Sequence, residues 1–151
     1  MTGRERVLAL LAGKPVDRLP LMPITMMFAA DQIGQPYGKY AMDYRVLVEG
    51  QLRTAERFAF DYVSAISDPA REAADFGAKI QFFPDQPPAI DEDNALLVDP
   101  ATLSRLKLPD PHSGRMHDRV QAVQLLRQRS DKLVEGWVEG PCAEAADLRG
   151  I

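Results

Sequence analysis

The stretch that decides the fold is Asp61–Gly77, DYVSAISDPAREAADFG. Its first part, Asp61–Ser67, is rich in β-branched and apolar residues, so it predicts a strand that is buried on both faces. Asp68 is a residue type preferred at helix N-caps, and the fixed φ of proline suits the first position of a helix over Pro69–Phe76. Strand, tight turn and helix in this order predict one βα unit of an α/β protein.

Segments on both sides of this unit repeat the alternation of strand and helix. Apolar runs predict two more strands, and helical periodicity predicts four more helices. The predicted strands are Leu19–Met27 and Leu133–Glu139, and the predicted helices are a short one that ends at Gly13 and those over Asp43–Phe58, Met116–Arg129 and Pro141–Gly150. Alternating βα units predict a parallel sheet, either a small open α/β sheet or the first part of a (β/α)₈ barrel.

The segment between the second and third predicted strands is expected to be peripheral. Ala78–Phe83 predicts an extended segment that pairs with Ala95–Val98 as a hairpin. Three prolines within residues 84–88 exclude a regular ladder there and predict a loop or lid. A short helix is expected after Asp99, ending near Leu106.

Composition and charge exclude several classes of protein. The 151 residues carry 18 Lys and Arg against 22 Asp and Glu, a net charge of −4 that gives no electrostatic case for nucleic acid. No apolar run approaches the roughly 20 residues that span a bilayer, and no signal peptide is found, so we expect a cytoplasmic protein. One cysteine, Cys142, with His112 and His117 gives neither an internal disulfide nor a metal-ligand set.

Four blocks of sequence carry a resemblance to a known family. They are RERVLALLAGKPVDRLPLMP at 4–23, DYVSAISDPAREAADFGAKIQF at 61–82, PDQPPAI at 84–90 and VEGWVEGPCAEAADLRG at 134–150. In this order they resemble the N-terminal part of the uroporphyrinogen decarboxylase family, whose members include porphyrinogen decarboxylases and methylcobamide-dependent methyltransferases that methylate a thiol. The resemblance implies a (β/α)₈ TIM barrel longer than this chain, so residues 1–151 are expected to be a truncated N-terminal portion with about three βα units.

A truncated barrel has consequences of its own. An exposed strand edge favours poor solubility or a homodimer, and the missing rim loops would leave the chain inactive by itself. The full-length protein is then expected to be the enzyme, and this chain an inactive fragment. The remaining alternative is a non-catalytic interaction module that uses the open sheet edge.

The resemblance assigns a catalytic role to Asp68. Ser67 and Asp68 match the family's Ser-Asp pair at the end of its second strand, and the carboxyl ends of barrel strands form the active-site rim. For the decarboxylases, the resemblance implies that this carboxylate accepts hydrogen bonds from pyrrole N–H groups and stabilises the positive charge that develops before carbon dioxide is lost. From the residues alone, the alternative is that Asp68 only caps the following helix, which contributes about 1 kcal/mol.

The exit of the first predicted strand, Thr25–Asp31, distinguishes the two branches of the family. In the decarboxylases this position carries arginines that bind the substrate's carboxylates, and Thr25–Asp31 contains none. The resemblance is therefore closer to the methyltransferases. It implies a corrinoid, free or carried by a corrinoid protein, and zinc bound by a histidine and two cysteines outside this chain. Decarboxylation of uroporphyrinogen III to coproporphyrinogen, which needs no cofactor, is the alternative.

Several rim residues are candidates for binding a small-molecule substrate or cofactor, a tetrapyrrole or a methyl-corrinoid. They are Thr25, Met27, Ser67 and Glu139. The alternatives are that Met26–Phe28 packs in the core and that Glu139 is a solvated carboxylate. Cys142 is expected to be a buried small residue, and His112 and His117 are expected to be exposed.

Overall fold

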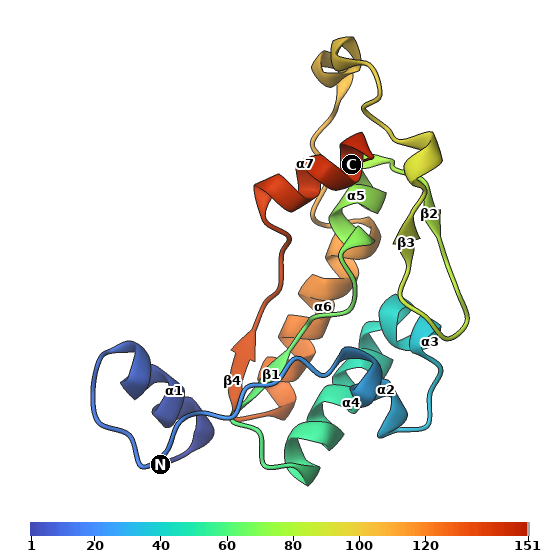
Figure 1. Ribbon diagram of the computed structural model, residues 1–151. Coiled ribbons are helices and arrows are strands. Elements are labelled where there is room, and N and C mark those ends of the chain that lie inside the picture. Colours follow the sequence, from blue (N-terminus) through green and yellow to red (C-terminus); the bar gives the residue numbers. More distant parts are fainter. Residues whose placement is uncertain (151) are drawn as a thin grey trace.

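The computed structural model describes residues 1–150, and helices and short strands alternate along the chain (Figure 1). In order they are α1 (Gly3–Leu11), α2 (Met26–Asp31), α3 (Tyr37–Met42), α4 (Tyr44–Arg57), β1 (Tyr62–Ser64), α5 (Ala70–Phe76), β2 (Ile80–Gln81), β3 (Ala89–Ile90), η1 (Glu92–Asn94), η2 (Pro100–Arg105), α6 (Gly114–Arg129), β4 (Leu133–Glu135) and α7 (Pro141–Arg149). No helix within this described part is long and apolar enough to cross a membrane.

The centre of the fold is a parallel pair of strands, β1 and β4, with α5 and α7 beyond their carboxyl ends (Figure 1). The register aligns Tyr62 with Leu133 and Ser64 with Glu135. All of β1 is buried, whereas β4 is half-buried. The predicted parallel pairing of the second and third apolar segments is therefore confirmed, although each strand is shorter than its segment.

The strand predicted over Leu19–Met27 is wrong, because the chain there is irregular up to the start of α2. The physical reason is that Pro20 and Pro23 have no N–H group to donate to a strand ladder. The segment is held by Asp61 instead. Leu21 N–H donates to the Asp61 carboxylate at 2.7 Å, and the Leu21 carbonyl accepts from Asp61 N–H at 3.0 Å.

The main hydrophobic core lies between β1 and the helices α2, α3, α4 and α6. Its buried residues are Ala29, Ala30, Tyr37, Tyr40, Ala41, Leu47, Val48, Ala55, Val63, Ala65, Ala122 and Leu126. Val48 and Ala55 belong to the apolar stripe predicted for α4, and Asp43 caps that helix by accepting from Arg45 N–H at 2.8 Å. Both long helices thus bury one face against the central strands, as βα units require.

The strands β2 and β3 form a separate antiparallel pair, in which Ile80 is aligned with Ile90. The partner predicted for Ala78–Phe83 was Ala95–Val98, and that pairing is wrong. The chain turns back earlier, through the proline-rich residues 84–88, which form the expected loop. The hairpin therefore closes through the loop over residues 82–88 and stands beside α3 and α5 (Figure 1).

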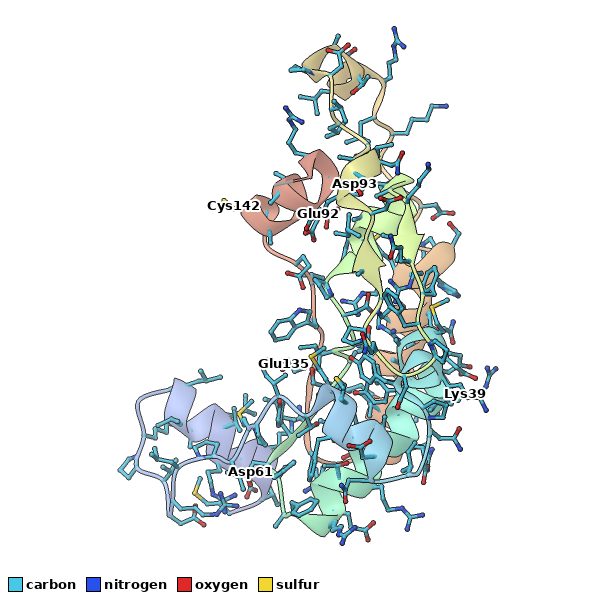
Figure 2. The ribbon with its side chains drawn as sticks, turned by 45° about the vertical axis from the view of Figure 1, so that its right-hand side comes forward. Lys39, Asp61, Glu92, Asp93, Glu135 and Cys142 are labelled. Carbon is cyan, nitrogen blue, oxygen red and sulfur yellow. The ribbon has the colours of Figure 1, made fainter. Side chains whose placement is uncertain are left out.

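The helix α1 stands apart from the rest of the molecule as an N-terminal arm, residues 1–22 (Figure 1). Thr2 and Glu5 form a capping box at the start of this helix. Arg6 fastens the arm to the body by donating to Asp61 at 2.5 Å, and its bond to Asp17 at 2.6 Å lies within the arm. Figure 2 shows Asp61 at the junction between the arm and the strands.

Candidate active site

Asp68 follows β1 at its carboxyl end and is almost fully buried. Its carboxylate accepts two parallel hydrogen bonds from Arg115 of α6, from Nη1 at 2.8 Å and from Nη2 at 2.7 Å. Ser67 Oγ donates a third at 2.6 Å. The alternative in which Asp68 caps the next helix is wrong, because α5 has no side-chain cap and the carboxylate oxygens are taken by Arg115 and Ser67.

Ser67 is itself held by Arg119, one helical turn after Arg115. Its Oγ accepts from Arg119 Nε at 3.2 Å and from Nη2 at 2.8 Å. Arg119 also donates to the Ala41 carbonyl and, at 2.6 Å, to the Asp118 carboxylate. Burial lowers the pKa of Arg119 to about 10, and the nearby Arg71 cation acts in the same direction. At neutral pH Arg119 therefore remains a cation, fixed on the serine.

A third arginine, Arg71, joins the ends of the two central strands. It lies in the first turn of α5 and is fully buried. Its guanidinium donates to the Ala65 carbonyl at 3.3 Å and to the Trp137 carbonyl at 3.0 Å, just past β1 and β4. Buried donors that find carbonyl acceptors fix the chain where they bind. Arg71 thus holds the segments that carry the candidate site.

Two stacked tyrosines of α3 hold the main chain of the same turn. Their ring centroids lie 5.4 Å apart. Tyr37 OH donates to the Ser67 carbonyl, and Tyr40 OH donates to the Ile66 carbonyl at 3.1 Å. Burial raises the pKa of both tyrosines well above the ordinary value, so both remain neutral hydrogen-bond donors.

Gln51 of α4 links this network to the predicted binding residue Thr25. Its Nε2 donates to Tyr40 OH at 2.7 Å and to Thr25 Oγ1 at 3.2 Å, while its Oε1 accepts from Ser64 N–H at 3.1 Å. Thr25 is buried. Through Gln51 and Tyr40 it belongs to the hydrogen-bond network that supports Ser67 and Asp68.

Met27 does not join this cluster. Met26 packs against the core, but Met27 is 46% exposed and Phe28 is 44% exposed. The alternative that assigned all three side chains to the core is therefore wrong for Met27 and Phe28. The reason is geometric: one face of the short helix α2 buries Ala29 and Ala30, and the opposite side stays in solvent.

Glu139 and Cys142 also lie outside the cluster. Glu139 is half-buried and accepts a hydrogen bond from Trp137 Nε1 at 3.1 Å. Cys142 is exposed on the outer side of α7, so its expected burial is wrong (Figure 2). It lies in the first turn of the helix, while Leu148, near the other end, is the buried residue.

The described residues contain no group of three or more His, Cys, Asp or Glu side chains that could hold a metal ion. The rings of His112 and His117 lie 6.4 Å apart. His112 is exposed, as expected, and His117 is half-buried.

The residues that sequence reasoning missed are the ones that surround Asp68. They are Arg71, Arg115, Arg119, Tyr37 and Tyr40. One local signal existed, because Arg115 and Arg119 are four residues apart and so share a helix face. Their partners Ser67 and Asp68 lie far away in the sequence, and no local pattern identifies them.

An apolar cavity of about 490 Å³ lies beside the cluster, between α6 and the chain that follows β4. Its apolar walls are formed by Ala65, Pro111, Met116, Val120, Val123, Trp137 and Val138. Arg71 and Arg119 also line it, although their donors are engaged as described. The region around Ser67 and Asp68 therefore combines polar side chains held by hydrogen bonds with an apolar surface.

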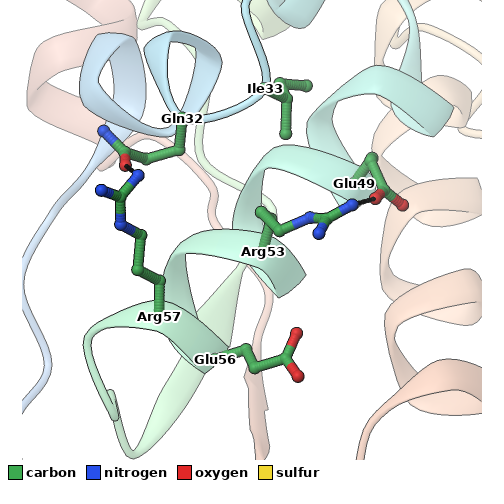
Figure 3. A pocket seen from close by; sticks show the side chains of 6 residues that line it. All are labelled: Gln32, Ile33, Glu49, Arg53, Glu56 and Arg57. Atoms are coloured by element: carbon green, nitrogen blue, oxygen red, sulfur yellow. Dashed lines mark hydrogen bonds and ion pairs between the residues drawn. The ribbon is translucent and has the colours of Figure 1, made fainter.

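A larger hollow of about 720 Å³ lies elsewhere, between α2 and α4 (Figure 3). Its polar side chains bond to one another, Arg57 to Gln32 at 2.9 Å and Arg53 to Glu49 at 3.6 Å. No residue of the Asp68 cluster lines it. These solvated pairs contribute little to stability, so the candidate site remains at Asp68.

Comparison with known families gives a match over residues 2–150 to the family described as Uroporphyrinogen decarboxylase (URO-D). The chain belongs to the uroporphyrinogen decarboxylase family. The expected family and the expected fold class, the N-terminal portion of a (β/α)₈ barrel, are confirmed. In that barrel β1 and β4 are neighbouring parallel strands, with α4 and α6 among the surrounding helices.

Among solved structures, the chain is similar to a methyltransferase from Methanosarcina mazei, with a TM-score of 0.73 and 22% sequence identity. The match covers 98% of this chain and 45% of that chain, so the chain spans less than half the length of this relative. At this identity the likeness shows the shared fold. No curated protein matches the sequence.

Proposed function

We propose that the uroporphyrinogen decarboxylase-family enzyme represented by this chain transfers a methyl group from a corrinoid to a thiol. The observation that carries the proposal is the surface at the start of α2. Thr25–Asp31 contains no basic residue, and the side chains of Met27 and Phe28 are exposed there. Such a surface suits an uncharged or weakly charged ligand.

The arginines near Asp68 support the same choice. A porphyrinogen decarboxylase must neutralise many substrate carboxylates, because each unpaired one in a low-dielectric site costs several kcal/mol. In this chain Arg115 is engaged by Asp68, and Arg119 by Ser67. Arg71 donates to main-chain carbonyls. None of the three is left free for a second set of carboxylates. The methyltransferase from Methanosarcina mazei, which has the same fold, agrees with this assignment.

In the proposed reaction, Asp68 is the residue that binds and orients the substrate or cofactor. Arg115 and Ser67 hold its carboxylate in one rotamer, which is the preorganisation that catalytic polar groups need. The side chain of Arg115 is 11% exposed and that of Asp68 is 0% exposed. A ligand therefore meets Arg115 first and contacts Asp68 beside this guanidinium, which stays in place.

Methyl transfer in this family implies zinc, and residues 1–150 do not fit a zinc site. Cys142 lies on α7, away from His112 and His117 near the start of α6. We therefore assign no zinc ligand, and no step through zinc, to these residues. In the proposed function, residues 1–150 contribute the part of the active-site rim around Asp68.

The test is an assay of the full-length protein with two substrates. Methylcobalamin and a small thiol are supplied in one reaction, and uroporphyrinogen III in the other. We expect formation of the methyl thioether, detected by mass spectrometry, together with demethylation of the corrinoid, followed by its visible absorbance. Release of carbon dioxide with accumulation of coproporphyrinogen, and no thioether, would overturn the proposal.

A further inference from the structure

The N-terminus of α6 is capped from another helix. Its own N-cap residue, Ser113, makes no side-chain cap. The two N–H groups of the first turn, from Arg115 and Met116, instead donate to the carboxylate of Asp75 at 2.8 Å and 2.7 Å. Asp75 lies in the last turn of α5. A carboxylate that accepts from helix N-terminal N–H groups is favoured both by hydrogen bonding and by the helix dipole.

The local backbone is shaped for this contact. Gly114, the first residue of α6, has φ +66°, a conformation that side chains with a Cβ rarely adopt. A Cβ at Gly114 would also overlap the Asp75 carboxylate. Glycine at this position therefore permits the close approach of α5 to the start of α6.

Arg115 contacts both carboxylates: its main-chain N–H donates to Asp75, and its side chain donates to Asp68. Arg115 reaches the Asp68 carboxylate at 2.8 Å and 2.7 Å. Asp68 immediately precedes α5, and Asp75 lies near the end of that helix. The two carboxylates, the short helix between them and Arg115 thus form a closed ring of contacts. Arg119, one turn further along α6, brings Ser67 into the same arrangement.

We propose that Asp75 is a positioning residue, which sets the start of α6 so that Arg115 holds Asp68 in its working orientation. The functional meaning of this role rests on the proposed function, whereas the structural coupling can be measured without it. Among the described residues, the carboxylate of Asp75 accepts its hydrogen bonds from main-chain N–H groups of α6, so it acts on Asp68 through Arg115. A simple helix cap would stabilise α6 without controlling the Arg115 side chain.

The test measures hydrogen exchange of the Arg115 Nη–H groups by NMR, in the protein and in the variants Asp75→Asn and Asp75→Ala. Arg115→Lys identifies the signals by their loss. We expect exchange in Asp75→Ala to be at least about tenfold faster, because the ion pair opens more often. Asp75→Asn keeps one acceptor oxygen, so its Arg115 exchange rate should lie between those of the unaltered protein and Asp75→Ala. Should Asp75→Ala fail to fold, Asp75→Asn alone decides the question.

The matched control is Asp99→Ala. Asp99 also caps a helix with its carboxylate, accepting from Ala101 N–H at 2.9 Å at the start of η2. This variant should leave the Arg115 exchange rate unchanged. Unchanged Arg115 exchange in the Asp75 variants, together with a lower melting temperature, would reduce Asp75 to an ordinary cap and overturn the proposal.

Kinetics of the full-length enzyme separate this proposal from the proposed function. Asp75→Asn should lower kcat by about tenfold with little change in KM, since a small displacement of a catalytic group costs rate more than binding. If Asp68→Asn leaves turnover unchanged while the Asp75 variants loosen Arg115, the proposed role of Asp68 fails and the positioning role stands. If the Asp75 variants leave Arg115 exchange unchanged and Asp68→Asn is inactive, the positioning role of Asp75 fails and the proposed role of Asp68 stands.

Discussion

At the scale of single residues, the molecule depends on the pair of Asp68 and Arg115. Both groups are removed from water, and each satisfies the charge of the other in two parallel bonds. Removal of one partner leaves the other charge buried without compensation. Asp68 is therefore required both for the stability of the turn after β1 and for the chemistry proposed there.

Asp68→Asn in the full-length protein should lower turnover by at least about tenfold, because a fixed carboxylate is lost from the rim. The same change should lower the free energy of unfolding by about 3 kcal/mol, since Arg115 loses its counter-ion. Steady-state kinetics and urea denaturation measure the two effects. Asp110→Asn, which changes an exposed loop carboxylate, is the control. Unaltered turnover in Asp68→Asn would leave it only a structural role.

At the scale of secondary-structure elements, the contact between α5 and α6 depends on the backbone of Gly114. Gly114→Ala should lower the free energy of unfolding by about 2 kcal/mol, because its φ of +66° is strained for alanine and its Cβ would meet Asp75. Gly140→Ala is the matched control. Gly140 begins α7 with φ −71° and open space around it, so the change should stay within about 0.5 kcal/mol. Equal losses in chemical denaturation would contradict this account.

The contact between α5 and α7 brings carboxylates together. Both oxygens of Glu144 on α7 are buried and lack a hydrogen-bond partner among the described residues. Burial, together with the nearby carboxylates of Glu72, Asp147 and Glu139, raises the pKa of Glu144 to about 7. The cation Arg71 lies 3.4 Å from Glu72 and also donates to main-chain carbonyls.

The docking of α7 should therefore depend on pH. The folded-state pKa of Glu144 lies above its ordinary value of 4.5. The contribution of Glu144 to the stability of the docked helix is therefore complete below pH 4.5 and is lost as the pH rises through about 7. Amide hydrogen exchange across α7, corrected for the intrinsic pH effect, should show more opening at high pH. Glu144→Gln should flatten this dependence, and an unchanged slope in that variant would exclude Glu144 as its source.

At the scale of the whole molecule, the N-terminal arm is attached to the body through one buried carboxylate. Asp61 accepts from Arg6 at 2.5 Å, from Arg18 at 2.6 Å and from Leu21 N–H at 2.7 Å. Asp17, the other partner of Arg6, is half-exposed. The two carboxylates share one arginine but differ in burial, which makes them a matched pair for mutation.

Asp61→Asn should lower the free energy of unfolding by about 3 kcal/mol and expose residues 1–22 to trypsin, because the cations lose their buried partner. Asp17→Asn should have a much smaller effect, as for a solvated pair. Urea denaturation and limited proteolysis with mass spectrometry measure both variants. Similar cleavage of the arm in the two variants would show that Asp61 is not the attachment.

Elements with a local signal were predicted from the sequence, and those set by distant partners were not. The helix after Asp43, the turn at Gly77 and the parallel strands follow from capping, backbone preference and apolar runs. The strand over Leu19–Met27 failed because its prolines cannot join a ladder. The prediction that Ala95–Val98 is the hairpin partner was wrong because strand register depends on where the chain turns back.

In the candidate site, too, some residues could be predicted from the sequence and others could not. Ser67 and Asp68 were proposed from the family resemblance together with their place at the end of a predicted strand. Their contacts with Arg115 and Arg119 come from three-dimensional packing of α6. Met27 and Glu139 were proposed for the same rim from chain order alone. The structure leaves Met27 in solvent and pairs Glu139 with Trp137.

The Asp68–Arg115 pair also sets an order of events during synthesis of the chain. The two residues are 47 positions apart. A ribosome that adds about 5–20 residues per second leaves Asp68 without its partner for roughly 2–9 s after it emerges. During that interval the apolar strand β1 has neither β4 nor α6 to cover it. The nascent polypeptide is thus most exposed to aggregation or to chaperones before the rim around Asp68 can assemble.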